Sequence, residues 1–293
     1  MDLFTAPAAM RAWSRGHRAA GRTLGVVPTM GALHDGHLAL IEAARRRAEV
    51  VIVTIFVNPL QFNEATDFDA YPRPIDDDLA TCETLGVDAV YAPTAASMYG
   101  EHFQTHVEPG GLAEPFEGAM RPGHFRGVAT VVTKLFGATR PDVAAFGRKD
   151  YQQLAIVRRM STDLDLGVEI LGVPTVREPD GLALSSRNVR LSPEDRRAAV
   201  VLSQALAAGA RAVANGERDA VSVEAGIRAS IEAEPRARLE YVAVVDPDTL
   251  APMSRVDAPA VALVAAWFGD VRLIDNIAIG PPTAGGSDHP AEQ

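Results

Sequence analysis

The stretch Pro28 to His37, PTMGALHDGH, decides the fold, because it joins a short apolar run to a helical pattern through a glycine turn. The run before it, Leu24 to Val27, is apolar throughout, as in a buried parallel strand. The segment His37 to Ala48 has apolar residues at helical spacing. A strand, a turn and a helix therefore follow one another, and the free N–H groups of such a helix start bind phosphate oxygens.

Two histidines lie at this helix start. Asp35 is the predicted N-cap, and His34 and His37, three residues apart, are expected on the same side of the first turn. Both could donate hydrogen bonds to a phosphate whose charge rises during a reaction. Taken alone, two histidines at a helix start are more often surface or capping residues than catalysts. A structural zinc cluster is disfavoured, because the single cysteine, Cys82, has no companion thiol.

Strand-like and helical stretches alternate along the first 175 residues. Strand-like runs cover 24–27, 50–57, 89–92, 143–146 and 168–173, and helical patterns cover 37–48, 75–85, 127–136 and 151–163. This alternation predicts an α/β fold, a Rossmann-like, doubly wound parallel sheet with helices on both faces. In such a sheet ligands bind beyond the carboxyl ends of the strands. The segments PTMG, NPLQF and GRKD, which follow the first, second and fourth runs, are therefore expected at one edge.

The pattern changes after Pro174. The loop VREPDGLALSSRN leads to helices expected at 193–216 and 220–233 and to strands expected near 241–245, 260–268 and 271–279. We therefore expect three parts. Residues 1–175 form the Rossmann-like domain, residues 176–280 form a smaller α+β C-terminal domain, and residues 281–293, rich in Pro and Gly, form a disordered tail.

Length and charge limit the functional classes. At 293 residues the chain can hold one large or two modest domains, each with its own core. The formal net charge of −10 argues against a nucleic-acid partner, which would need a basic face. No apolar run reaches the roughly 20 residues of a membrane span, and the first residues do not resemble a signal peptide. We therefore expect a cytoplasmic protein with neither a nucleic-acid nor a membrane partner.

Five separated motifs carry a family resemblance. They are PTMGALHDGH (28–37), FVNPLQF (56–62), RPGHFRGVATVV (121–132), FGRKDYQQL (146–154) and DGLALSSRN (180–188). Through this ordered set the chain resembles the pantothenate synthetase family, the pantoate:β-alanine ligases, over most of its length. The HxGH element alone would indicate only the wider nucleotidyltransferase superfamily, which includes class I aminoacyl-tRNA synthetases. The specificity lies in the set.

The resemblance implies a reaction. In the family, pantoate attacks the α-phosphate of ATP with loss of pyrophosphate, and β-alanine then displaces AMP from the pantoyl adenylate to give pantothenate. A carboxylate and an amine do not condense at neutral pH, so the adenylate supplies the leaving group, and the protein's task is positioning and charge stabilisation. The resemblance further implies Mg²⁺ with the ATP and a homodimer formed through the first domain.

The resemblance also assigns residues. His37, usually regarded as the proton donor, His34 and Lys149 are the implied catalytic residues. Gln61 and Gln153 are the implied ligands of pantoate, with Gln61 close to β-alanine, and an amide that both donates and accepts suits a hydroxy acid. The implied ATP site comprises Met30, Gly31, Ala32, Leu33, His34, Asp35, Gly36, His37, Gly147, Arg148, Lys149, Asp150, Val176, Leu184, Ser185, Ser186 and Arg187.

Some of these positions depart from the family or have plainer explanations. Glutamate is common in the family where this chain has Arg148, which puts nucleotide affinity in question, whereas Leu184 in place of methionine conserves volume. Without the motifs, Lys149 would be read as a solvated lysine. The SSRN segment could equally lead into a helix, although the guanidinium of Arg187 suits phosphate oxygens. Its resemblance to the mobile loop of the synthetase superfamily implies closure of the second domain over ATP.

The metal ligands stay open. Asp77 and Asp78 lie in a run of three aspartates that suits a helix start, and one of them could help to hold magnesium.

Two alternative functions also remain: a nucleotidyltransferase that acts on another small acceptor, and a catalytically silent nucleotide-binding module. The nucleotidyltransferase would not need Gln61 and Gln153 around a small hydroxy acid, and in the silent module His37 and Lys149 would matter for binding but not for turnover. The full set of five motifs disfavours both.

Overall fold

The computed structural model describes residues 1–63 and 68–281. Contacts divide the chain into two compact units, the first formed by residues 1–178 and 183–186 and the second by residues 179–182 and those from 187 onward. The expected tail, 281–293, lies outside the described residues except for Pro281.

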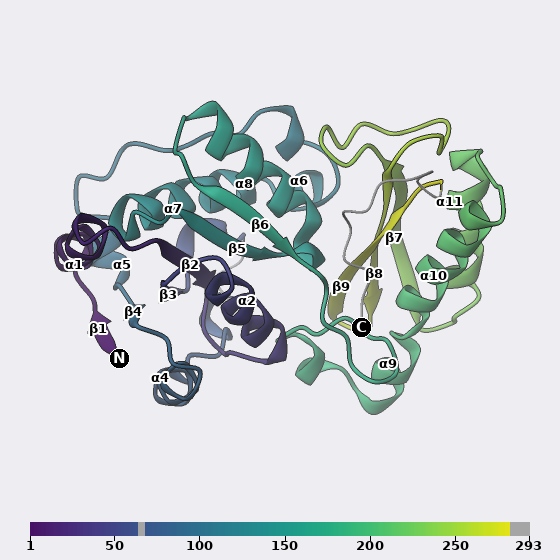
Figure 1. Ribbon diagram of the computed structural model, residues 1–293. Coiled ribbons are helices and arrows are strands. Elements are labelled where there is room, and N and C mark those ends of the chain that lie inside the picture. Colours follow the sequence, from purple (N-terminus) through teal and green to yellow (C-terminus); the bar gives the residue numbers. More distant parts are fainter. Residues whose placement is uncertain (64–67, 282–293) are drawn as a thin grey trace. The chain divides into compact units, whose positions relative to one another are not determined.

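The first unit is built on a six-stranded parallel sheet in the order β1-β4-β3-β2-β5-β6 (Figure 1). The predicted Rossmann-like α/β fold is therefore confirmed. Two additional elements, β1 and α1, precede the first predicted strand. In chain order the unit contains β1 (Asp2–Phe4), α1 (Pro7–Ala19), β2 (Leu24–Thr29), α2 (Asp35–Arg45), β3 (Val50–Ile55), η1 (Pro59–Gln61), α4 (Ile75–Thr84), β4 (Ala89–Tyr91), α5 (Ala95–Met98), η2 (Gly111–Ala113), α6 (Glu117–Met120), α7 (His124–Thr139), β5 (Val143–Gly147), η3 (Arg148–Asp150), α8 (Tyr151–Asp163) and β6 (Glu169–Val173).

Side chains alternate across this sheet into two apolar cores. In β2, Leu24 and Val26 belong to the core that α1, α7 and α8 share. Val27 belongs to the core on the other face, with α2 and α4. Between Leu24 and Val26, Gly25 allows the end of α2 to approach closely, because a Cβ built there would lie 3.4 Å from the Cβ of Ala44, in α2, and 3.0 Å from that of Ala48, just beyond it. Both faces are covered, as continuous apolar strands require.

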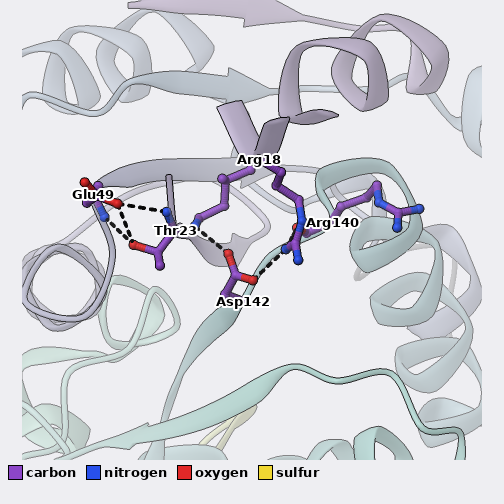
Figure 2. A network of polar contacts seen from close by, with 6 residues as sticks. Arg18, Thr23, Glu49, Arg140 and Asp142 are labelled. Atoms are coloured by element: carbon purple, nitrogen blue, oxygen red, sulfur yellow. Dashed lines mark hydrogen bonds and ion pairs between the residues drawn. The ribbon is translucent and has the colours of Figure 1, made fainter. Parts of the chain in front are cut away.

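A polar network ties the amino ends of the central strands (Figure 2). The Asp142 carboxylate accepts hydrogen bonds from the backbone N–H of Leu24, at 2.8 Å, and from the Arg18 guanidinium, at 2.6 Å. Alongside it, Glu49 accepts a hydrogen bond from the backbone N–H of Thr23 at 3.0 Å. Charged groups therefore fix the amino ends of β2 and β5, and the opposite ends of these strands carry the motifs.

The second unit confirms the smaller α+β fold. It contains η4 (Asn188–Arg190), α9 (Pro193–Ala198), α10 (Val201–Ala214), α11 (Ala220–Glu232), β7 (Ala237–Val245), β8 (Ala260–Phe268) and β9 (Val271–Ile279). The strands form an antiparallel sheet in the order β7-β8-β9, and α10 and α11 share its apolar core (Figure 1).

The single helix expected over 193–216 is wrong. Two helices, α9 and α10, occupy this range, and the interruption lies at Ala199 and Val200. There the backbone N–H of Leu202 bonds to the carbonyl of Ala199, three residues back. This tighter, 3-10-type bond replaces the α-helical pattern for one turn, which apolar periodicity does not reveal.

Candidate active site

The site lies at the topological switch point of the parallel sheet. The chain proceeds outward from β2 through β3 and β4 on one side, and from β5 to β6 on the other, so the order reverses between β2 and β5. Ligands of open α/β sheets bind at this point, beyond the carboxyl ends of the strands. The segment Met30–His37 follows β2, and the segment Gly147–Asp150 closes β5 and forms η3. Two of the five motifs are therefore brought to the same edge.

The turn after β2 has an unusual backbone that a buried carboxylate supports. Gly31 and Ala32 have φ values of 84° and 52°, in the left-handed region that favours glycine. The carboxylate of Asp78, in the first turn of α4, accepts hydrogen bonds from the N–H of Ala32 at 2.9 Å and of Leu33 at 2.8 Å. A Cβ at Gly31 would lie 2.7 Å from this carboxylate. Asp78 therefore holds the turn in shape.

Sequence reasoning missed this role of Asp78. In the sequence the run of aspartates indicates a favourable helix start, and Asp76 and Asp77 are indeed exposed. Asp78 is 3% exposed and lies one helical turn before the fully buried Cys82. That i, i+4 spacing to an apolar residue is the signal that would have placed Asp78 on the inner face of α4.

His34 and His37 form a reciprocal cap at the start of α2. The predicted N-cap, Asp35, is wrong: His34 is the N-cap and Asp35 is the first helical residue. Nδ1 of His34 accepts a hydrogen bond from the N–H of Gly36 at 3.1 Å, and Nδ1 of His37 accepts one from the N–H of His34 at 3.2 Å. An imidazole nitrogen takes the place that a hydroxyl or carboxylate oxygen usually fills.

The cap fixes the chemical state of both histidines. Burial lowers the pKa of His37 to about 3, with the neighbouring His34 as the second cause. Burial also lowers the pKa of His34, and the charge of Lys149 adds to this effect. Both rings are therefore neutral at pH 7, and because Nδ1 accepts, the proton resides on Nε2. The two rings, 4.2 Å apart between centroids, present two Nε2–H donors.

The segment after β5 adds charge to this site. Lys149, whose side chain is 19% exposed, lies near enough to His34 to influence its pKa, and its Nζ is 4.0 Å from the carboxylate of Asp150. Asp150 acts on both histidines in the opposite direction. The Arg148 side chain binds elsewhere, donating from Nε to the carbonyl of Gly172 in β6 at 3.0 Å. Lys149 is therefore the residue of this segment whose charge acts on His34.

Gln61 joins the second and third motifs to the turn after β2. Its side-chain Nε2 lies 3.3 Å from Sδ of Met30, within that turn. Its backbone carbonyl accepts hydrogen bonds from Nδ1 of His124, at 2.8 Å, and from Arg121, at 3.2 Å. Burial and the charge of Arg121 lower the pKa of His124 to about 4, so this ring also stays neutral. Segments far apart in the sequence meet at Gln61.

The second predicted amide, Gln153, is half-buried in the first turn of α8. Within the described ranges no hydrogen bond joins it to Gln61. Its neighbour Gln152 is buried and bridges the N–H of Glu117, at 3.0 Å, and the carbonyls of Leu112 and Pro115, both at 2.8 Å. Gln152 therefore stabilises the segment before α7 through that segment's backbone, a role that sequence reasoning missed.

The predicted phosphate loop begins as a narrow hairpin. The N–H of Leu184 bonds to the carbonyl of Val176 at 3.0 Å, and Arg177 and Ala183 form an antiparallel bridge. Ser185 and Ser186 belong to the first unit, whereas Arg187 belongs to the second. The SSRN motif therefore lies where the chain passes from one unit to the other.

The family model described as Pantoate-beta-alanine ligase matches residues 2–278. The chain belongs to this family. Among curated relatives, pantothenate synthetase from Anaeromyxobacter dehalogenans is 52% identical over 282 residues, covering 94% of this chain and 97% of the relative. Pantothenate synthetase from Salinispora arenicola is 57% identical over 259 residues, covering 88% and 91%. Ligation of pantoate to β-alanine is the activity that this membership gives the chain.

Solved structures of the ligase family agree with this. Pantothenate synthetase from Thermus thermophilus superposes with a TM-score of 0.90 at 47% identity, covering 96% of this chain and 100% of that chain. The ligase from Francisella tularensis, solved with beta-gamma ATP and beta-alanine, gives a TM-score of 0.77 at 33% identity, covering 94% and 97%. The predicted family and enzyme class are confirmed.

Two further features are absent from the described part of this ligase. Residues 1–63 and 68–281 hold no cluster of three or more His, Cys, Asp or Glu side chains that could bind a metal ion. Over the same residues, no helix has the length and apolar character needed to cross a membrane.

Proposed function

We propose that this ligase activates pantoate with ATP at the switch point between β2 and β5, using His34, His37 and Lys149 to bind and stabilise the phosphates. The observation that carries the proposal is the pair of neutral imidazoles, whose Nδ1 atoms are occupied by backbone N–H groups. Each ring therefore offers a directed Nε2–H to an anion. Both rings lie at the start of α2, where the helix dipole also favours negative charge.

The first step is the attack of a pantoate carboxylate oxygen on the α-phosphorus of ATP. The bond from this phosphorus to the bridging oxygen breaks, and pyrophosphate leaves with the electron pair. In the free protein His37, with a pKa of about 3, is neutral, so it contributes a hydrogen bond rather than a proton. Lys149 adds a positive charge that compensates the charge developing on the transferred and leaving phosphates.

In the second step the β-alanine amine attacks the acyl carbon of pantoyl adenylate. The amine loses a proton, the acyl–oxygen bond breaks, and AMP leaves. Gln61 and Gln153 are the proposed pantoate ligands, and the position of Gln61 beside Met30 supports this assignment because it places an amide next to the nucleotide turn. Val176, Leu184, Ser185, Ser186 and Arg187 complete the proposed ATP site, and Arg187 would reach the phosphates when the second unit closes.

The remaining parts of the proposal rest on family membership. Mg²⁺ enters with ATP, because this ion prefers phosphate oxygens and few carboxylates. The protein acts as a homodimer through the first unit, and its single, buried Cys82 suits the reducing cytoplasm. EDTA should abolish product formation and excess Mg²⁺ should restore it, and light scattering should give twice the chain mass.

The experiment that tests the function measures AMP and pyrophosphate with ATP, Mg²⁺ and pantoate, with and without β-alanine. We expect AMP release to require all three substrates and to fall by about 10² to 10⁴ in His37→Ala. Pyrophosphate release without β-alanine-dependent AMP would instead support the alternative, adenylyl transfer to another acceptor. Binding of ATP with no turnover would support a silent nucleotide-binding module.

A further inference from the structure

The chain uses lysine at only two positions. It contains 26 arginines but only Lys134 and Lys149. Lys149 belongs to the proposed phosphate site, whereas Lys134, on α7, does not. Because an ammonium group is more compact than a guanidinium, a lysine in such an arginine-rich chain indicates a place that needs the smaller cation.

Lys134 lies over two aromatic rings. Its Nζ is 5.9 Å from the ring centroid of Tyr99 and 5.3 Å from that of Phe103, and the two centroids are 4.9 Å apart. Within residues 1–63 and 68–281 this ammonium has neither an ion pair nor a hydrogen bond. The two cation–π contacts therefore hold it in place.

The Tyr99 hydroxyl in turn fixes the amide of Asn58. It donates to Oδ1 of Asn58 at 2.7 Å, and the N–H of Leu60 donates to the same oxygen. Nδ2 of Asn58 donates to Oε1 of Gln61, at 3.0 Å, and to the carbonyl of Gly127, at 3.2 Å. Asn58 is 1% exposed, and all four hydrogen-bonding positions of its amide are used. Its orientation is therefore determined.

The hydrogen bond from Asn58 also fixes the orientation of the Gln61 amide. Because Oε1 of Gln61 accepts from Asn58, Nε2 must point the other way, where Sδ of Met30 lies 3.3 Å from it. An amide nitrogen carries two hydrogens, so a second N–H is left for a ligand. The network thus presents Gln61 as a donor beside the nucleotide turn.

We propose that Lys134 and Tyr99 are positioning residues that orient Gln61 through Asn58. The cation over the ring draws electron density from the phenol and strengthens its hydroxyl as a donor. Burial raises the pKa of Tyr99, so this hydroxyl keeps its proton at physiological pH. The inference rests on the proposed function, in which Gln61 binds pantoate.

Tyr99→Phe tests the proposal, because it keeps the ring and removes the hydroxyl. We expect the KM for pantoate to rise about five- to tenfold, the factor that one lost hydrogen bond gives, while the KM for ATP stays within about twofold. Lys134→Met should shift the pantoate KM in the same direction, and Lys134→Arg, which keeps the charge but replaces the compact ammonium with a larger guanidinium, should restore only part of it. The matched control is Tyr91→Phe, which removes another hydroxyl of the same core, one that contacts Sδ of Met98.

A double variant separates positioning from general loss of stability. In a Gln61→Ala background, Tyr99→Phe should have no further effect on the pantoate KM, because its target is gone. Effects that multiply, or a Tyr99→Phe enzyme equal to wild type, would overturn the proposal. If Gln61→Ala itself leaves the pantoate KM unchanged, the assignment of Gln61 fails and the inference falls with it.

A second readout does not depend on turnover. With ¹⁵N-labelled glutamine, the side-chain amide signals of Gln61 should shift in Tyr99→Phe and in Lys134→Met but not in Tyr91→Phe. Unchanged signals would refute the positioning role even in an enzyme that makes pantothenate. Shifted signals in an enzyme that does not make it would instead locate the failure in the proposed function.

Discussion

At the scale of single residues, the buried carboxylate of Asp78 links stability to the nucleotide turn. Its two oxygens accept from the N–H groups of Ala32 and Leu33, in a turn whose left-handed backbone at Ala32 is unfavourable for a residue with a Cβ. A strained backbone conformation persists where the surrounding structure stabilises it, and here the two charge-assisted hydrogen bonds to Asp78 stabilise the turn. The position of His34 and His37 therefore depends on a side chain from α4.

Replacement of Asp78 by asparagine should weaken the turn. Asparagine offers one acceptor oxygen and places an NH₂ group against a backbone N–H, so we expect a loss of about 1–3 kcal/mol in the free energy of unfolding and a raised KM for ATP. Urea unfolding and steady-state kinetics measure the two effects. Asp76→Asn, an exposed change in the same helix turn, is the control, and an equal effect of both variants would contradict the role of Asp78.

His37 should make the fold less stable in acid. Its pKa is about 3 in the folded protein, against an ordinary value of 6.5, so between these pH values the unfolded chain binds a proton that the folded one does not. The contribution of His37 to the free energy of unfolding is therefore fully present above pH 6.5. It is lost as the pH decreases, by up to about 1.4 kcal/mol per pH unit for one proton. His124, with a pKa of about 4, adds to this slope in the same direction.

The variant His37→Gln should lower the dependence of unfolding free energy on pH by about one proton, with the contributions of His34 and His124 left. Urea titrations at pH 5 and pH 7 give the slope. An unaltered slope in His37→Gln would mean that this ring titrates equally in both states.

The sequence could predict which residue types gather at the site but not what holds them. His34 and His37 are visible because they follow a glycine turn between an apolar run and a helical pattern. Asp78, Asn58 and Gln152 are not visible, because their roles consist of bonds to segments distant in the sequence. The capping error at Asp35 has a local cause: the ring of His34 accepts the N–H of Gly36, so the helix begins one residue earlier than expected.

At the scale of elements, the contact between α7 and η1 positions Gln61. A Cβ at Gly127 would lie 2.3 Å from the carbonyl oxygen of Leu60 and 2.8 Å from the N of Gln61. No side chain fits there, so glycine lets the helix touch the backbone of NPLQF directly. The same close approach lets Asn58 reach the carbonyl of Gly127.

Gly127→Ala should therefore displace η1 or α7 and disturb Gln61. We expect a destabilisation of about 1–3 kcal/mol and a higher KM for pantoate, since overpacking against backbone cannot be relieved by a rotamer change. Gly137→Ala, on the same helix with no atom near its Cβ, should be neutral or stabilising by up to about 1 kcal/mol. Thermal unfolding of the pair decides the matter, and equal behaviour would exclude the proposed contact.

Long periodic elements were predictable, and short or interrupted ones were not. The runs that became β2, β3, β5 and β6 are apolar and bounded by turn residues, so their type follows from the sequence. The edge strand β1 has three residues, too few for any periodicity, and it exists because it pairs with β4. The break between α9 and α10 depends on one 3-10-type bond in a stretch with uninterrupted helical propensity.

At the scale of the whole molecule, the apolar cores form two separate sets, one in each unit. The cores on both faces of the parallel sheet belong to the first unit, and the core between α10, α11 and the antiparallel sheet belongs to the second. Each unit has its own core, so one can move relative to the other without unfolding. The chain passes between them at 178/179, at 182/183 and, for the last time, at Ser186 and Arg187.

If the second unit closes over ATP, bound ligands should protect this passage from trypsin. Arg187 and Arg190 are cleavage sites, and the intervening Val189 is 87% exposed, so the free protein should be cut here early. A non-hydrolysable ATP analogue with pantoate should slow this cut severalfold, because a closed loop resists the local opening that proteolysis needs. Cleavage at Arg15, on the exposed side of α1, supplies the internal reference and should keep its rate. Equal rates at Arg187 and Arg190 with and without the ligands would show that catalysis proceeds without closure, and Arg187 would then lose its proposed place at the phosphates.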